Sequence, residues 1–209
     1  MPQTEMTCHS PATEQAPDGA TRIALIGSPN GGKTSIFNQL TGLHAKTGNY
    51  PGVTVSRSEG VARIHDHTFA IEDLPGTYSL SPISPDEQVV VDVLDGRMDQ
   101  VSAPDALVVV ADATALRRSL LLLAEVLPRH LPTAVVVTMT DELRRRQGSL
   151  DVTALSQALG VPVVAVVANR GIGIGELRNL LTTWHDWDRP PLDPPSRSSE
   201  LAGWVDSVL

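Results

Sequence analysis

One glycine-rich segment constrains the fold of this chain more than any other feature. Residues Gly27 to Thr34 read GSPNGGKT and match the pattern GxxxxGK followed by Ser or Thr. Before the pattern, TRIALIG is a short apolar run that predicts a buried strand from Thr21, and after it residues from Lys33 to about Leu40 predict a helix. A strand, a glycine-rich turn and a helix in this order predict an α/β fold whose turn can wrap main-chain N–H groups around phosphate oxygens.

The rest of the chain alternates between apolar runs and helical patterns. Continuous apolar strands separated by helices predict a mostly parallel sheet with helices on both faces, in which ligands bind beyond the carboxyl ends of the strands. Residues 43–57 lack periodicity and predict a long loop, and residues 65–67 predict a turn. The further predicted strands are residues 59–64, 68–72, 106–112, 133–139 and 161–167, and the further predicted helices are residues 86–94, 116–127, 152–159 and 174–184.

The two ends of the chain differ from its middle in composition. Residues 1–20 lack an apolar segment and predict a flexible tail, and residues 189–199 hold four prolines and predict a linker. We therefore expect a tail at 1–20, one domain at 21–184, and at 185–209 a Pro-rich linker followed by the beginning of another helix. No apolar run is long enough to cross a bilayer, so we expect this fragment to be soluble.

The net negative charge of the chain argues against general electrostatic binding of polyanions. The chain has 16 Lys and Arg against 24 Asp and Glu, a formal net charge of −8. Binding to nucleic acid is therefore not expected, because such binding depends on a basic surface that neutralises phosphates. Any phosphate must be held locally, by main-chain amides and a few chosen side chains.

Five residues supply the chemistry expected around a bound triphosphate. Lys33 places a point charge on the β- and γ-phosphates, and the Thr34 hydroxyl binds Mg²⁺. The segment DLPG ends a predicted strand; its carboxylate, Asp73, can reach Mg²⁺ through water, and the Gly76 amide can meet a γ-phosphate. Thr54, in the predicted loop, is the natural second hydroxyl ligand for Mg²⁺.

The segment Thr138 to Asp141 ends another predicted strand and indicates which base is bound. A carboxylate at Asp141 can accept the N1–H and N2–H₂ donors of guanine, which adenine does not offer. An aspartate in this position can also simply cap a helix. Sequence alone leaves both readings open.

Together these segments resemble the cytosolic G domain of the FeoB ferrous-iron transporters. The resemblance rests on GSPNGGKTSIFNQLTG, GNYPGVTV (48–55) and EDLPGTYSLSPISPDEQVV (72–90), and it covers about residues 21–184. It implies a Ras-like P-loop GTPase fold with a six-stranded, mostly parallel sheet. It also implies a GTP-hydrolysing, Mg²⁺-dependent switch that regulates ferrous iron uptake by an attached membrane transporter.

The resemblance extends to partners and location. A helical regulatory domain and a transmembrane part are expected to follow in the same polypeptide, and the stretch 185–209 is then the truncated start of that helical domain. The intact transporter would place this domain at the cytoplasmic face of the inner membrane, where a further copy of the chain is a candidate partner. Direct iron binding by this chain is not expected.

Hydrolysis is expected to be slow and to depend on potassium. Thr77 stands where Ras-type enzymes carry a glutamine that orients water, and no arginine finger is evident, a loss worth about 10³ to 10⁵ in rate. By similarity to potassium-activated members, Asn30 holds K⁺ beside the phosphates with help from residues 48–54; its side chain can also satisfy its own turn. The expected catalytic residues are Asn30, Lys33, Thr54 and Gly76.

Two departures from the family pattern concern affinity. Thr138 replaces an asparagine that braces the P-loop, and Val167 replaces a serine, although the Ala168 N–H can still meet guanine O6. We therefore expect guanine selectivity with weak binding and fast release. The predicted nucleotide-binding residues are Gly27, Asn30, Gly31, Gly32, Lys33, Thr34, Ser35, Val53, Thr54, Thr138, Met139, Asp141, Val167 and Ala168.

Two alternative functions remain at this point. The chain could be a nucleotide-binding regulatory module with negligible hydrolysis, as the missing glutamine suggests. It could also be another potassium-type GTPase, acting in tRNA modification or ribosome assembly, although the residues after Gly76 and the lack of a basic surface argue against this.

Overall fold

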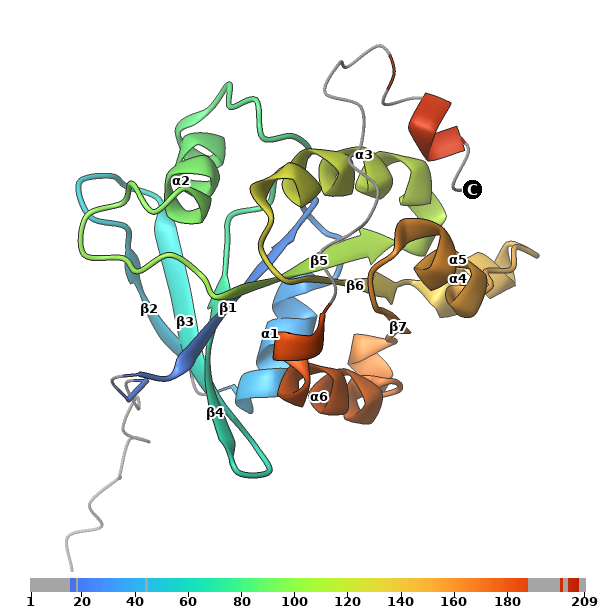
Figure 1. Cartoon of the computed structure of the whole chain (residues 1–209), viewed down its shortest axis with the longest axis horizontal. Coiled ribbons are helices and arrows are strands. Elements are labelled where there is room, and N and C mark those ends of the chain that lie inside the picture. Colours follow the sequence, from blue (N-terminus) through green and yellow to red (C-terminus); the bar gives the residue numbers. More distant parts are fainter. Residues whose placement is uncertain (1–15, 18, 44, 188–199, 201–202, 207–209) are drawn as a thin grey trace, which may run out of the picture.

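A computed structural model describes residues 16–17, 19–43, 45–187, 200 and 203–206. Its centre is a seven-stranded sheet with the order β2-β3-β4-β1-β5-β6-β7 (Figure 1). β1 pairs in parallel with β4 and β5, and β6 and β7 continue the parallel half, whereas β3 runs antiparallel to both of its neighbours, β2 and β4. The strands are β1 (Thr21–Gly27), β2 (Ala45–Asn49), β3 (Ser56–Ile64), β4 (His67–Asp73), β5 (Ala106–Asp112), β6 (Thr133–Thr138) and β7 (Val163–Ala165).

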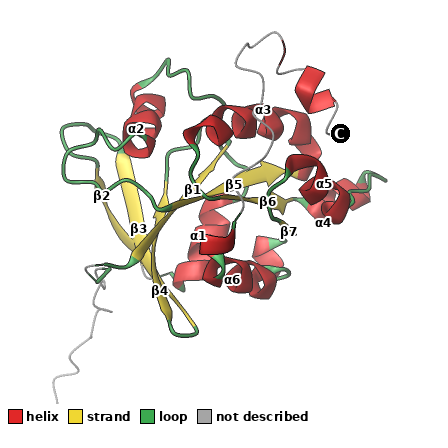
Figure 2. Ribbon diagram, viewed as in Figure 1, coloured by secondary structure: helices red, strands yellow, loops and turns green. Residues whose placement is uncertain are grey.

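Helices cover both faces of this sheet (Figure 2). One core lies between the sheet and α2, α3 and α5, and the other lies between the sheet and α1 and α6. Alternate residues of β1 supply the two cores, with Ala24 and Ile26 in one and Ile23 and Leu25 in the other. The helices are α1 (Lys33–Thr41), α2 (Pro85–Leu94), α3 (Leu116–Val126), α4 (Thr140–Arg145), α5 (Val152–Leu159) and α6 (Ile174–Thr182), with short 3₁₀ turns at Ala113–Ala115, Leu127–Arg129, Ala168–Arg170 and Trp184–Asp186.

The α/β, Ras-like class predicted from the sequence is confirmed, but the sheet has a seventh strand. β2 lies within the stretch 43–57, which was predicted to be a loop, and it pairs antiparallel with β3. The loop proper is therefore only residues 50–55. The strand predicted at 161–167 is shorter, at Val163–Ala165, and α4 was not predicted.

The predicted outer segments lie largely outside the described residues. Of the tail at 1–20, residues 1–15 and 18 are not described, and of the linker at 185–209 residues 188–199, 201–202 and 207–209 are not described. Within the described part, Trp187 is buried in the core beneath α1 and α6, and Val205 is fully buried against the core on the α3 side. Among the described residues, no helix has the length and apolar character needed to cross a membrane.

Candidate functional site

The glycine-rich turn lies where β1 ends and α1 begins, at the carboxyl edge of the parallel strands. Gly32 is the N-cap of α1 with φ of 88°, a left-handed conformation that favours glycine. No side chain caps this helix end. Its first main-chain N–H groups are consequently the kind of donors that bind phosphate at a helix N-terminus. Asn30 sits in the same turn with φ of 62° and is exposed.

Two adjoining hollows surround this turn. The first has a volume of about 410 Å³ and is lined by Ser28, Pro29, Asn30, Gly32, Lys33, Thr34, Ser35, Gly76 and Met139. The second, also about 410 Å³, shares Lys33, Thr34 and Gly76 with the first and adds Thr54 and Asp73. The structure thus brings together the side chains that the sequence predicted to act on phosphate and on Mg²⁺.

Lys33 and Asp73 form the electrostatic centre of the two hollows. The Lys33 ammonium contacts the Asp73 carboxylate directly, and both side chains are at least nine-tenths buried. The other Asp73 oxygen accepts a hydrogen bond from the Thr34 hydroxyl at 2.7 Å. Residues from the start of α1 and the end of β4 therefore meet at one point, although they lie about forty positions apart in sequence.

The loop after β4 is packed tightly against the glycine-rich turn. The Thr77 N–H donates to the Gly27 carbonyl at 3.0 Å. A Cβ atom on Gly76 would lie 2.9 Å from the backbone of Pro29, so only glycine fits at this approach. Thr77 itself is buried, and its hydroxyl donates to the Ser79 carbonyl at 2.6 Å. Its hydroxyl is therefore engaged within its own loop.

Thr138, at the end of β6, holds the turn from below. Its hydroxyl lies 2.7 Å from the Gly31 carbonyl and 3.2 Å from the Ala111 carbonyl, and Thr138 is buried. Although its side chain is shorter, Thr138 thus contacts the glycine-rich turn, which in the family pattern is braced by an asparagine at this position. Its own methyl group would also lie 3.4 Å from a Cβ on Gly32.

The residues predicted to read the base lie beyond the two hollows. Asp141 is in the first turn of α4, where its carboxylate pairs with Arg145 at 3.3 Å. The N-cap of α4 is Met139 with φ of 56° and without a side-chain cap, so Asp141 does not cap this helix. Val167 and Ala168 are both buried, at the start of the 3₁₀ turn after β7.

Sequence reasoning missed a contact to this last turn. The Gln39 side chain on α1 donates to the Ala168 carbonyl at 3.0 Å. A glutamine in a helix carries no signal for such a role. Among the other predicted binding residues, Gly27, Gly31 and Val53 are not among the lining residues of either hollow, and Val53 is 38% exposed on the loop 50–55.

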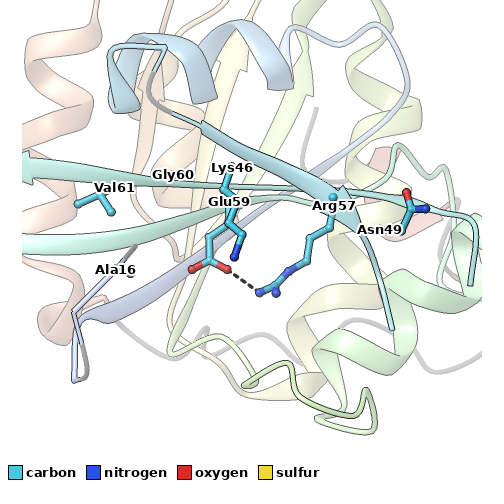
Figure 3. A pocket seen from close by; sticks show the side chains of 8 residues that line it. Ala16, Lys46, Asn49, Arg57, Glu59, Gly60 and Val61 are labelled. Carbon is cyan, nitrogen blue, oxygen red and sulfur yellow. Dashed lines mark hydrogen bonds and ion pairs between the residues drawn. The ribbon is translucent and has the colours of Figure 1, made fainter. Parts of the chain in front are cut away.

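A third hollow, of about 340 Å³, lies beside β2 and β3 (Figure 3). Two of its charged lining residues pair with each other, because Arg57 contacts Glu59 at 2.6 Å, and Arg57 also contacts Glu72 at 2.9 Å. The Tyr50 hydroxyl also donates to Glu72 at 2.9 Å. The pKa of Tyr50 is raised, chiefly by its burial and secondly by the negative charge of this carboxylate. This hollow has no helix N-terminus, so the first two are the candidate nucleotide site. Within the described residues, no group of three or more His, Cys, Asp or Glu is placed to hold a metal ion.

Fold and site define a Ras-like domain of the P-loop class. The family model for Ferrous iron transport protein B matches residues 21–181, so the chain belongs to this family as its G domain. One relative is the Fe(2+) transport protein A/Fe(2+) transporter FeoB fusion protein of Porphyromonas gingivalis, 42% identical over 174 residues, which are 83% of this chain and 20% of the relative. The chain thus spans about a fifth of the length of that relative.

Solved structures agree with the family. The cytosolic domain of the T. maritima FeoB iron transporter in apo form is 34% identical with a TM-score of 0.77, covering 86% of this chain and 69% of that chain. The same domain in GDP form is 36% identical with a TM-score of 0.75, covering 82% of this chain and 66% of that chain.

Proposed function

We propose that this chain binds and hydrolyses GTP as a switch domain that regulates ferrous iron uptake by an attached membrane transporter. The observation that carries the proposal is the meeting of Lys33, Thr34 and Asp73 beneath an uncapped helix N-terminus. Two findings support the guanine nucleotide and the transport context. One related structure is described in a GDP form, and the relatives are described as Fe(2+) transporters.

In this proposal the protein acts mainly by positioning phosphates. The main-chain amides between Gly27 and Lys33 hold the β-phosphate, and the Lys33 ammonium turns from Asp73 to the β- and γ-phosphates. Gly76 lines both hollows, so its amide can reach the γ-phosphate. Water then attacks that phosphorus, giving GDP and inorganic phosphate.

The residues present fit a magnesium ion. Mg²⁺ prefers oxygen ligands, and the Thr34 hydroxyl lies 2.7 Å from an Asp73 carboxylate oxygen, in a hollow that Thr54 also lines. Thr34 and Thr54 would hold the ion directly, and Asp73 would hold it through water. When bound, Mg²⁺ neutralises charge on the phosphates.

Hydrolysis in this proposal is slow without a monovalent cation. The buried hydroxyl of Thr77 is engaged with Ser79, so this residue does not replace the missing glutamine. The amide oxygen of Asn30, exposed at the rim of the first hollow, is a suitable ligand for K⁺, which would supply positive charge near the phosphates. Backbone groups of residues 48–54 would hold the attacking water.

Base choice in this proposal depends on α4 and on the turn after β7. Asp141 would leave Arg145 and accept the guanine N1–H and N2–H₂ groups, while the Ala168 N–H meets O6. Val167 lacks the family hydroxyl, so we expect weak binding and fast release. The helical and transmembrane domains of the transporter are the proposed partners, at the cytoplasmic face of the inner membrane, with possible self-association and no direct iron binding.

Phosphate release from GTP in KCl and in NaCl tests this function. The unaltered chain should release phosphate faster in KCl, and Asn30→Ala should lose that difference while still binding GDP. Equal release in both salts would contradict the role of potassium. GDP binding without any phosphate release would favour the non-hydrolysing module, which the engaged Thr77 also favours. Membership of the ferrous iron transport family leaves the tRNA and ribosome alternative without support.

A further inference from the structure

A carboxylate on α3 holds the loop that follows Gly76. The Glu125 side chain accepts the Leu80 main-chain N–H at 2.5 Å and the Ser79 hydroxyl at 3.0 Å. The same hydroxyl accepts the Ser81 N–H at 3.0 Å. Three successive residues of the loop are therefore organised around one carboxylate. Hydrogen bonds to an ionised acceptor are about twice as strong as neutral ones.

A second residue of α3 contacts the same loop. The Arg118 guanidinium lies over the Tyr78 ring, with its central carbon 5.2 Å from the ring centroid. Glu125 and Arg118 are seven positions apart, two turns of the same helix, so they lie on one face of α3. That face of α3 consequently contacts the loop at two points.

The other end of this loop is fixed to the glycine-rich turn. Thr77 donates to the Gly27 carbonyl, and its hydroxyl donates to the Ser79 carbonyl. Gly76 therefore sits between two of the anchors of this loop, the glycine-rich turn on one side and, through Thr77 and Ser79, Glu125 on the other, while Glu87 of α2 holds the loop further along by accepting the Ile83 N–H at 2.9 Å. Its approach to Pro29 leaves no room for a Cβ atom. Displacing Ser79 from Glu125 would remove one of those two anchors.

We propose that Glu125 is a positioning residue for the γ-phosphate of GTP, acting through Ser79 and Leu80 on the Gly76 amide. The inference rests on the proposed function, because it concerns the same phosphate site. It adds a specific consequence: Glu125 sets the preference for a triphosphate over a diphosphate. GDP has no γ-phosphate and does not meet Gly76, so its affinity does not depend on this anchor.

The test compares binding of GDP and of a non-hydrolysable GTP analogue by calorimetry with Mg²⁺. For Glu125→Ala we expect the analogue to bind about tenfold more weakly, the effect of losing a hydrogen bond to a charged group. The GDP affinity of Glu125→Ala should stay within twofold of that of the unaltered chain. The affinity of Glu125→Gln for the analogue should lie between those of the unaltered chain and Glu125→Ala. A matched control is Asp105→Asn, since Asp105 also accepts a main-chain N–H, from Arg22 at 2.7 Å, but at the opposite end of β1.

The outcomes are distinct. Loss of analogue binding in Glu125→Ala with GDP binding retained supports the proposal. Equal weakening of both ligands, an unchanged ratio, or the same change in Asp105→Asn overturns it, because a general loss of stability would act on both ligands. If the unaltered chain bound neither nucleotide, the proposed function itself would fail.

Discussion

Replacing Thr138 by valine removes one hydroxyl from a buried position beneath the candidate nucleotide site. That hydroxyl is 2.7 Å from the Gly31 carbonyl and 3.2 Å from the Ala111 carbonyl, so its single hydrogen is directed chiefly to Gly31. Valine has nearly the same shape and offers no donor. Because Gly31 is buried, its carbonyl would then lack this partner, at a cost of about 1–2 kcal/mol.

Much of that cost should appear in nucleotide binding, because Gly31 belongs to the turn that we propose wraps the phosphates. An energy of about 1–2 kcal/mol corresponds to a fivefold to thirtyfold loss of GDP affinity. Calorimetric titration with GDP and Mg²⁺ measures the loss, and Thr138→Ser, which keeps the hydroxyl, should bind more tightly than Thr138→Val.

The same strand offers a matched control. Thr133 is also buried, and its hydroxyl donates to the Leu131 carbonyl at 2.8 Å, at the opposite end of β6. Thr133→Val should lower the melting temperature without changing GDP affinity. If Thr138→Val bound GDP as tightly as the unaltered chain, or Thr133→Val lost as much affinity, the bracing role of Thr138 would be refuted.

Two further predictions concern stability. Val205 is fully buried, whereas the Arg117–Asp206 ion pair is half exposed. In denaturant unfolding, Val205→Ala should therefore lower the free energy of unfolding by about 2 kcal/mol and Arg117→Ala by less than about 1 kcal/mol. The reverse order would contradict this. Burial and the Glu72 carboxylate raise the pKa of Tyr50 above its ordinary 10.0. As pH rises above 10, Tyr50 therefore loses its proton in the unfolded chain before it does so in the folded chain, and the free energy of unfolding falls by up to about 1.4 kcal/mol per pH unit. Tyr50→Phe should show a shallower alkaline decline in melting experiments, and an identical slope would count against the raised pKa.

Strong local signals made most of the fold predictable. The strand Ala106–Asp112 was predicted at its observed bounds, because seven consecutive residues of high apolar content leave little choice. The helix Val152–Leu159 was also predicted at its observed bounds, with Asp151 capping it and Gly160 ending it. In both cases the residues that decide the element lie within the element or beside it.

The missed elements depend on distant partners. β2 reads AKTGN, a polar stretch that forms a strand only because β3 offers its main-chain groups for pairing. α4 has six residues, TDELRR, too few to show a helical period. The site followed the same rule: the spacing of Lys33 and Thr34 was visible in sequence, whereas the contact of Gln39 with Ala168 spans 129 positions and needs the folded sheet.

The contact between Lys33 and Asp73 has a consequence for the order in which ligands leave and arrive. Each charge is buried and already compensated by the other. A polyphosphate that binds the lysine leaves the buried carboxylate without an opposite charge, and a divalent cation that binds the carboxylate leaves the buried lysine without one. Only when both ligands come together does every charge keep an opposite neighbour, so removing the metal by chelation should also loosen the nucleotide.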